Sequence, residues 1–267
     1  MAQPLWDAPH RGLGDANVGV GCGICMNTAS QTGIAEVLPE LNPMLDREVL
    51  AKEFARSKRI HITNILTKPS AERVYRTLTG QTAWTTTHNT GGKRVDVRNL
   101  AQGERAQISL AACEWAHHNF AYLYDNHRMS YDGEPYADQN HYLAKFVSFL
   151  NSPAFIGFIR EVTGMPAVAY ADAQATLYRA GDFLTEHDDT AGDKNRLAAY
   201  VFSFTTRWLS DWGGVLEFVN DRAHIGPGFV PEFNSLNLFS VPQIHLVSQV
   251  TLFGGQRYSV TGWLRSF

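Results

Sequence analysis

The sequence predicts a mainly β fold with supporting helices, built around a double-stranded β-helix (jelly-roll) core over about residues 170–267. Short segments rich in aromatic and β-branched residues follow one another in this region without helical segments between them. Turns that contain glycine or proline separate these segments, and evenly spaced strands of this kind are typical of a two-sheet roll. The predicted strands cover residues 175–180, 197–206, 212–218, 235–241, 244–250 and 257–264.

The residues before the roll predict helices and a few more strands. Asp46 is placed to N-cap a helix that runs through Ser57, with Leu45 and Leu50 as a hydrophobic staple. We expect the added strands to extend the larger sheet and the helices to buttress the outside of the roll. Further helices are predicted over residues 67–80, 103–126 and 153–164, and strands over 59–62, 83–88 and 94–97.

The chain divides into an N-terminal extension, residues 1–40, and a single domain, residues 41–267. The extension is rich in Gly, Asn and Thr with little periodicity, so we expect it to be loosely ordered or laid across the surface. Cys22 and Cys25 form a C-x-x-C motif within it, but no second ligand pair and no βαβ pattern accompany them. We therefore assign this motif no function.

Composition and charge exclude several classes of protein. The 267 residues carry a net charge of −3, with 44% hydrophobic and 18% charged residues, as in an ordinary globular protein. Nothing in this charge favours nucleic acid or an anionic membrane as a partner. No apolar run approaches the roughly 20 residues of a membrane helix, and no secretory signal pattern is present, so the expected location is cytoplasmic. The oligomeric state is not indicated.

The segment around His187 contains a candidate metal site. On a strand, His187 and Asp189 would point to the same side, because side chains alternate with a period of two. His245, from a distant predicted strand, would complete a set of two histidines and one carboxylate, which is diagnostic of non-haem Fe(II) oxygenases. Taken singly, each histidine is also explained as a core residue and Asp189 as a turn residue. A zinc hydrolase could use the same ligands.

Several motifs in a fixed order support one family. The stretch from Thr176 to Arg265 resembles the 2-oxoglutarate/Fe(II)-dependent dioxygenase superfamily, in particular its prolyl-4-hydroxylase-like branch. The R-x-S-x-x-G-W motif is similar to the ending of ribosomal-protein prolyl hydroxylases, whereas residues 1–40 match nothing. The matching motifs are Tyr178, H-D-D at 187–189, W-G-G-x-L at 212–216, V-P-x-x-H at 241–245 and R-x-S-x-x-G-W at 257–263.

The resemblance implies Fe(II), 2-oxoglutarate as cosubstrate and dioxygen, with ascorbate as a further candidate cofactor. Arg257 would hold the far carboxylate of 2-oxoglutarate through two parallel hydrogen bonds, and Ser259 would add a hydroxyl. Tyr178 would hydrogen-bond the cosubstrate near the metal. The tyrosine that many prolyl hydroxylases carry in this pocket corresponds to Ser203, to which we assign no role. Because hydrolytic zinc does not require Arg257, iron is favoured.

The implied activity is hydroxylation, most plausibly of a prolyl residue in a peptide or protein. A free amino acid or another small metabolite is the alternative substrate, since function resides in the site rather than the fold. A degenerate oxygenase that acts as a binding or sensing module is an alternative of another class, but the complete ligand set argues against it. Weak candidates for the substrate entrance are Arg179, Arg207 and Trp208, with Arg196 nearby.

Overall fold

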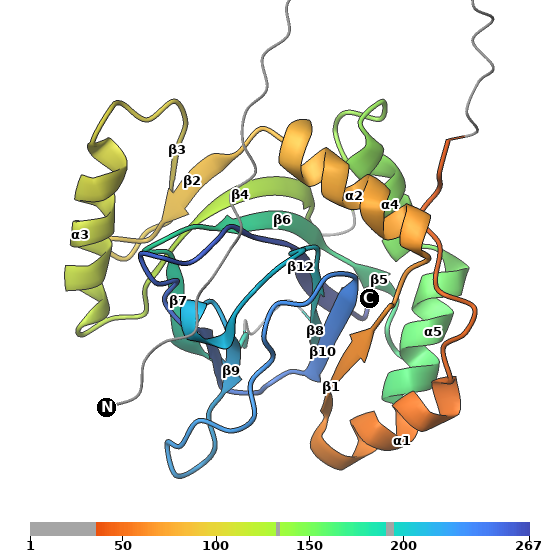
Figure 1. Cartoon of the computed structure of the whole chain (residues 1–267). Coiled ribbons are helices and arrows are strands. Elements are labelled where there is room, and N and C mark those ends of the chain that lie inside the picture. Colours follow the sequence, from red (N-terminus) through yellow and green to blue (C-terminus); the bar gives the residue numbers. More distant parts are fainter. Residues whose placement is uncertain (1–35, 132–133, 191–194) are drawn as a thin grey trace, which may run out of the picture. The chain divides into compact units, whose positions relative to one another are not determined.

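The computed structural model describes residues 36–131, 134–190 and 195–267 (Figure 1). The helices are α1 (Arg47–Ser57), α2 (Lys68–Gly80), α3 (Glu104–Ala116), α4 (Tyr142–Leu150) and α5 (Pro153–Thr163), with a short 3-10 turn at Ser210–Trp212. The strands are β1 (Arg59–Thr63), β2 (Thr85–His88), β3 (Val95–Val97), β4 (Tyr122–Ser130), β5 (Tyr170–Ala171), β6 (Ala173–Tyr178), β7 (Phe183–His187), β8 (Arg196–Ser203), β9 (Leu216–Phe218), β10 (Ser235–Ser240), β11 (His245–Val247) and β12 (Arg257–Arg265).

One antiparallel sheet curls on itself to form the roll (Figure 1). Its strands follow the order β1-β10-β8-β12-β6-β4-β7-β11-β9, and β2 and β3 extend it beside β4. The larger wall of the roll consists of β1, β10, β8, β12, β6 and β4. The smaller wall, which faces it, consists of β7, β11 and β9. The predicted jelly-roll core is therefore confirmed.

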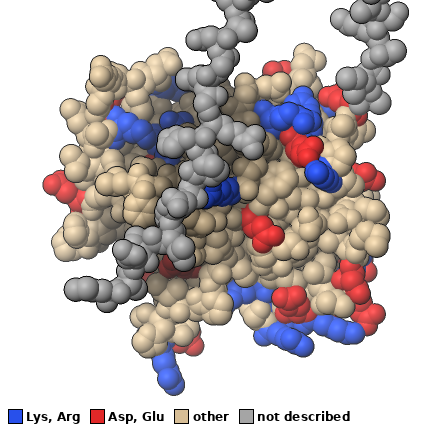
Figure 2. All heavy atoms as spheres, in the orientation of Figure 1, with Lys and Arg blue, Asp and Glu red and all other residues tan. Residues whose placement is uncertain are grey.

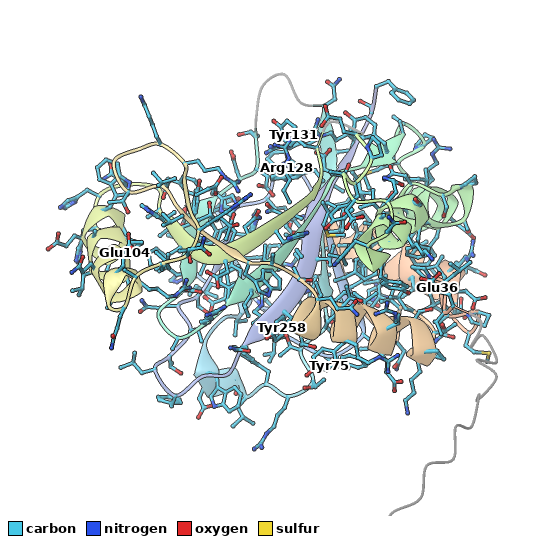
Figure 3. All side chains as sticks on the ribbon, turned by 90° about the horizontal axis from the view of Figure 1, so that it is seen from above. Glu36, Tyr75, Glu104, Arg128, Tyr131 and Tyr258 are labelled. Carbon is cyan, nitrogen blue, oxygen red and sulfur yellow. The ribbon has the colours of Figure 1, made fainter. Side chains whose placement is uncertain are left out.

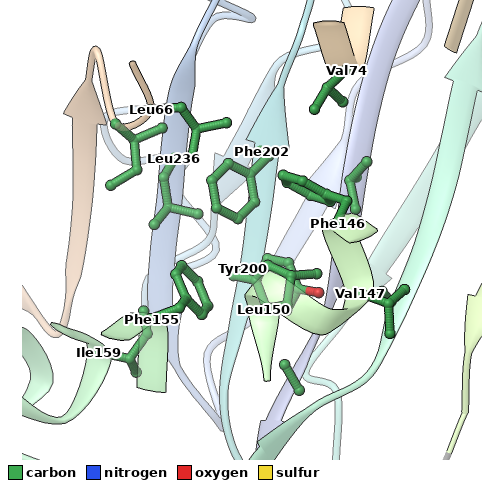
Figure 4. Close-up of a cluster of buried hydrophobic side chains, with 14 of the residues drawn as sticks. Leu66, Val74, Phe146, Val147, Leu150, Phe155, Ile159, Tyr200, Phe202 and Leu236 are labelled. Carbon is green, nitrogen blue, oxygen red and sulfur yellow. The ribbon is translucent and has the colours of Figure 1, made fainter. Parts of the chain in front are cut away.

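The outer face of the larger wall is covered by α1, α2, α4 and α5, and the interface is filled by aromatic and aliphatic side chains (Figure 4). The ring of Phe202 on β8 lies 5.4 Å from the ring of Phe146 on α4 and 5.8 Å from that of Phe155 on α5, measured between centroids. All three side chains are fully buried. Burial of a side chain of this size stabilises the fold by about 1.5–3 kcal/mol.

The predicted helix ends are confirmed where short-range capping determines them. The Asp46 carboxylate accepts a hydrogen bond from the Val49 backbone amide at 3.1 Å, and α1 begins at the next residue. Ser152 caps α5 in the same way, and Gly164 ends it with a left-handed φ of 68°.

The helix predicted over residues 103–126 is wrong in its second half. Helix α3 ends at Ala116, and the segment from Tyr122 becomes β4, a central strand of the roll. The side chains of Tyr122 and Tyr124 line the cavity inside the roll, whereas Leu123 packs under α3 in an apolar cluster on the other face. This alternation is compatible with a strand, but only pairing with β2, β6 and β7 selects it.

Two further elements differ from the expectation. Helix α4 was not predicted from the sequence, and the strand expected over residues 212–218 is present only from Leu216 to Phe218.

In the described ranges no single helix is long and apolar enough to cross a membrane. Helices α4 and α5 together, bent by 46°, reach that length and composition, and both are largely buried in the core. The compact unit begins at Val37, so the interpretation of residues 1–40, with Cys22 and Cys25, falls almost wholly outside the described residues.

Candidate metal centre and cosubstrate pocket

His187 and His245 lie side by side although they are 58 positions apart in the sequence. His187 ends β7 and His245 begins β11, where the two residues are paired across the antiparallel strands, with ring centroids 4.2 Å apart. The Nδ1 atoms lie 2.9 Å from the Thr185 carbonyl and 2.8 Å from the Gln243 carbonyl, respectively. Because a carbonyl only accepts, each Nδ1 donates, and each Nε2 keeps the lone pair that a metal requires.

Asp189 completes the set from a turn rather than from a strand. β7 ends at His187, and Asp189 has a left-handed backbone with φ of 62°. Its Oδ1 lies 3.4 Å from Nε2 of His187, and its Oδ2 lies 3.5 Å from Nε2 of His245. The structure therefore brings the three expected residues together, with ligand atoms all within 4.8 Å of one another. Strand alternation therefore does not explain the position of Asp189, because this residue lies beyond the end of β7.

The protonation states of these groups suit a divalent metal. Burial opposes ionisation of Asp189, but the neighbouring side chains of His187, His245 and Trp263 outweigh it and hold the pKa of Asp189 below its usual value. Burial and, next, the neighbouring His187 lower the pKa of His245 to about 4, so that this imidazole is neutral near neutral pH. A carboxylate and two imidazole nitrogens in this arrangement fit Fe(II).

Arg196 and Trp263 support the unusual conformation of Asp189. Nη1 of Arg196 donates a hydrogen bond to the Asp189 carbonyl at 2.9 Å, and the Trp263 side chain hydrogen-bonds its carboxylate. The guanidinium carbon of Arg196 also lies 3.6 Å from the centre of the Trp263 ring, as a cation–π contact. A left-handed backbone costs a non-glycine residue about 1–3 kcal/mol, and these contacts offset that cost.

The three ligands line a cavity of about 1350 Å³ that is bounded by both walls of the roll. A row of aromatic rings runs along one side of it, from His187 to Arg257. From the His187 ring to the first aromatic ring of the row, and then from each ring to the next, the centroids are 5.5, 5.7, 5.5 and 5.1 Å apart. The guanidinium carbon of Arg257 lies 5.0 Å from the centre of the last ring, that of Tyr178. The rings of the row are those of Phe120, Tyr122, Tyr124 and Tyr178.

Arg257 lies at the closed end of the row and is only 3% exposed. Within the described residues it has no salt-bridge partner, and its Nε has no hydrogen-bond partner. Burial lowers the pKa of Arg257, since a desolvated cation is unfavourable. A buried guanidinium without a counter-charge is costly, so the site fits an anionic ligand, and a carboxylate matches its planar geometry. Tyr178 lies beside Arg257, as an expected cosubstrate contact should.

Two hydroxyl groups accompany Arg257. Ser259 on β12 pairs with Ser203 on β8, and both side chains are buried. Neither Oγ has a hydrogen-bond partner among the described residues, which suits groups that would bind a ligand. The sequence interpretation gave Ser259 a role in this pocket and assigned none to Ser203. Strand alternation was the available signal, because Ser203 shares its face with Val201 and Ala199, which line the cavity.

Three expected substrate contacts need correction, because Arg179, Arg207 and Trp208 do not line the cavity. Arg179 follows the inward-facing Tyr178 and so points to the outer face, where it lies 2.8 Å from the Asp125 carboxylate. Arg207 is exposed to solvent. Trp208 packs behind the pocket, and its indole Nε1 donates a hydrogen bond to the Gly213 carbonyl at 2.8 Å. By contrast, Arg196 does line the cavity.

The W-G-G motif has a packing role at the same place. A Cβ atom on Gly214 would lie 2.9 Å from the Trp208 ring and 3.5 Å from Cδ of Arg257, and the residue has a left-handed φ of 60°. Gly213 leaves still less room, since a Cβ atom there would lie 2.0 Å from the Gln249 carbonyl oxygen. The two glycines therefore allow the chain to close the pocket behind Arg257.

The sequence of the roll matches a known family. Residues 173–265 match the profile of the 2OG-Fe(II) oxygenase superfamily. The prolyl 3-hydroxylase sudestada1 of Drosophila melanogaster is 28% identical over 119 residues, which are 40% of this chain and 22% of that protein. The chain thus spans about a fifth of the length of this relative.

Solved structures share the fold. A prolyl-4-hydroxylase of Pseudomonas putida superimposes with a TM-score of 0.56 and 13% identity, over 83% of this chain and 99% of that one. A prolyl hydroxylase of Trichoplax adhaerens, solved with a peptide fragment of hypoxia inducible factor, gives a TM-score of 0.57 and 14% identity over 82% and 89%. The matched segment holds the metal ligands and Arg257 in one cavity, so both its sequence and its geometry are similar to those of the 2-oxoglutarate/Fe(II)-dependent oxygenases.

Proposed function

We propose that this dioxygenase hydroxylates a prolyl residue within a peptide or protein. The observation that carries the proposal is the size of the cavity, about 1350 Å³, around the metal ligands. Pockets for small molecules usually measure about 300–1,000 Å³. The excess leaves room for an extended peptide segment beside the cosubstrate.

The walls of the cavity offer suitable groups for such a segment. Asn126 and Gln174 project from the adjacent strands β4 and β6. Nδ2 of Asn126 donates a hydrogen bond to Oε1 of Gln174 at 2.6 Å. Primary amides carry both donors and acceptors, so they can bind a peptide backbone. The aromatic rings of Trp84, Tyr131 and Trp263 line the same cavity and present apolar surface for a pyrrolidine ring.

Each part of the site then has a defined role. His187, Asp189 and His245 hold Fe(II), while Arg257, Ser259 and Ser203 hold the far carboxylate of 2-oxoglutarate. Fe(II), with 2-oxoglutarate and dioxygen bound, supplies the oxidising power that hydroxylates an unactivated C–H bond. The contribution of the chain is orientation: the aromatic row shields the cosubstrate from water, and Arg196 with Trp263 keeps Asp189 in place.

The relatives and the charges of the cavity favour a peptidyl substrate over a free amino acid. One relative is named a prolyl 3-hydroxylase, and one neighbour was solved with a peptide. A free amino acid would require a carboxylate for its ammonium group. Four described acidic residues line the cavity, and Asp189 is one of the metal ligands. Asp96 is paired with Arg94 at 3.1 Å and Asp172 with Arg265 at 2.7 Å. The Asp188 carboxylate accepts hydrogen bonds from the Thr190 amide and hydroxyl at 2.9 and 2.6 Å.

The test is a substrate panel. The purified chain is incubated aerobically with Fe(II) and 2-oxoglutarate, together with proline-containing peptides, free L-proline and other amino acids. We expect at least one peptide to gain the mass of one oxygen atom, with succinate released in parallel and little change in free L-proline. Turnover of a free amino acid with no peptide hydroxylated would contradict the proposal. Nuclear magnetic resonance of the product identifies the carbon that is hydroxylated.

Other expectations from the sequence stay predictions. They are a cytoplasmic location and the absence of nucleic-acid and membrane partners. Cell fractionation tests the location, and binding assays with an oligonucleotide and with anionic vesicles test the partners.

A further inference from the structure

Two arginines at the rim of the cavity are not explained by the metal or the cosubstrate. Arg98 follows β3, Arg128 lies on β4, and both line the cavity. Both are exposed, and neither is in salt-bridge contact with a carboxylate in the part of the chain that the structure describes. Arg94 differs because it forms an ion pair with Asp96 at 3.1 Å, whereas Arg98 acts on the Asp96 carboxylate only through its charge at longer range.

The sheet register brings these two arginines to the same rim. β2 pairs with β3 on one side, Thr86 opposite Val97, and with β4 on the other, Thr85 opposite Asn126. Arg98 comes one residue after Val97 and therefore stands across β2 from Asn126. Arg128 is two residues further along β4 than Asn126, so its side chain shares the face of Asn126.

Other observations agree with this placement. Burial, then His141 and the positive charge of Arg98, lower the pKa of His127, so Arg98 is within electrostatic reach of β4. Figure 2 shows Lys and Arg side chains gathered over the β2–β3 region. Figure 3 shows Arg128 next to Tyr131, and the Arg128 guanidinium carbon lies 4.8 Å from the centre of the Tyr131 ring. That cation–π contact restrains Arg128 without neutralising it.

We propose that Arg98 and Arg128 recognise carboxylates of the substrate, and that the preferred substrate is an acidic peptide with Asp or Glu near its target proline. The inference rests on the proposed peptidyl hydroxylation. A guanidinium matches a carboxylate through two parallel hydrogen bonds, and two guanidinium groups at one rim select against a basic segment. A polyanion such as nucleic acid would need an extended surface with several Lys and Arg side chains, whereas the whole chain carries a net charge of −3.

The test compares three peptides that differ only beside the proline, where they carry Glu, Gln or Lys. We expect kcat/KM for the Glu peptide to exceed that for the Gln peptide by about tenfold, with the Lys peptide poorest, and the advantage should shrink at high salt. In the double variant Arg98→Gln/Arg128→Gln, the Glu advantage should disappear through a higher KM with little change in kcat. Reversal of both charges to Glu should favour the Lys peptide. Arg222→Gln, at an exposed loop position outside the cavity, is the matched control.

Binding without turnover separates this inference from the proposed function. Fluorescence anisotropy of the same labelled peptides is measured anaerobically with Fe(II) and 2-oxoglutarate present. If no peptide is hydroxylated but the Glu peptide binds through the two arginines, the proposed function fails and the rim assignment stands. The inference is overturned if the double variant keeps the full Glu preference in binding. It is equally overturned if only an oligonucleotide binds at this rim.

Discussion

The two faces of the larger wall differ in what they do, although the same strands build both. On β8, Tyr200 and Phe202 point outward and are fully buried against the helices, whereas Val201 lines the cavity and Ser203 lies on the same face of the strand as Val201. On β12, Val260 belongs to the apolar core, and its neighbour Ser259 carries a buried hydroxyl without a partner. Adjacent residues therefore serve opposite purposes.

The difference shows how stability and function are divided. Apolar burial on the outer face stabilises the fold, while an unpaired buried polar group on the inner face costs about 1–3 kcal/mol. A ligand that bonds those groups removes the cost. Substitutions on the outer face should thus change stability with little effect on binding, and those on the inner face should do the reverse.

The largest effect is expected at the metal centre. His187→Ala or His245→Ala should abolish succinate formation and iron binding, because each removes a ligand, while the free energy of unfolding changes by less than about 1–2 kcal/mol. Asp189→Ala should act likewise, unless an added anion such as formate fills the vacant position. The visible charge-transfer band of the anaerobic complex with Fe(II) and 2-oxoglutarate reports binding. Full turnover in either histidine variant would refute the triad.

On the outer face, Phe202→Ala should lower the free energy of unfolding by about 3–5 kcal/mol, because it leaves a cavity between β8, α4 and α5. Urea denaturation measures the loss. The affinity of the folded fraction for 2-oxoglutarate should not change. A loss of affinity as large as the loss of stability would show that the two faces are coupled.

Next in size is Arg257→Ala, which should raise the concentration of 2-oxoglutarate needed for half-maximal activity by about tenfold or more. A charge-assisted contact in a buried pocket is worth about 1.5–3 kcal/mol. Arg257→Lys should recover only part of this affinity, since the planar fork is lost. If the requirement for 2-oxoglutarate stays the same in Arg257→Ala, its carboxylate binds elsewhere.

The smallest effect is expected for Ser203→Ala, the inner-face neighbour of Phe202. Removing a buried hydroxyl without a partner should leave the free energy of unfolding unchanged or raise it by up to about 1 kcal/mol. The affinity for 2-oxoglutarate should fall severalfold. Denaturation curves with and without 2-oxoglutarate measure both quantities, and a variant with lower stability and unchanged affinity would assign Ser203 to the fold alone.

The sequence by itself determined those features that are encoded over a few positions or in motifs. Asp46 and Ser152 cap helices through amides three residues away, so capping was visible without the fold. The strands of the roll carried their own composition and turns. His187, Asp189, His245 and Arg257 were recognised from ordered motifs, and the structure places them in one cavity.

Tertiary structure alone decided which of two compatible patterns each ambiguous segment adopts and which face meets the cavity. The residues after Ala116 fit a helix or a strand, and pairing with β6 across the sheet selected β4. The same register turned Ser203 inward and Arg179 outward, and it brought Arg98 and Arg128 to one rim. Strand pairing joins residues far apart in the chain, and a shift of one residue would exchange the two faces, so no local pattern could settle these positions.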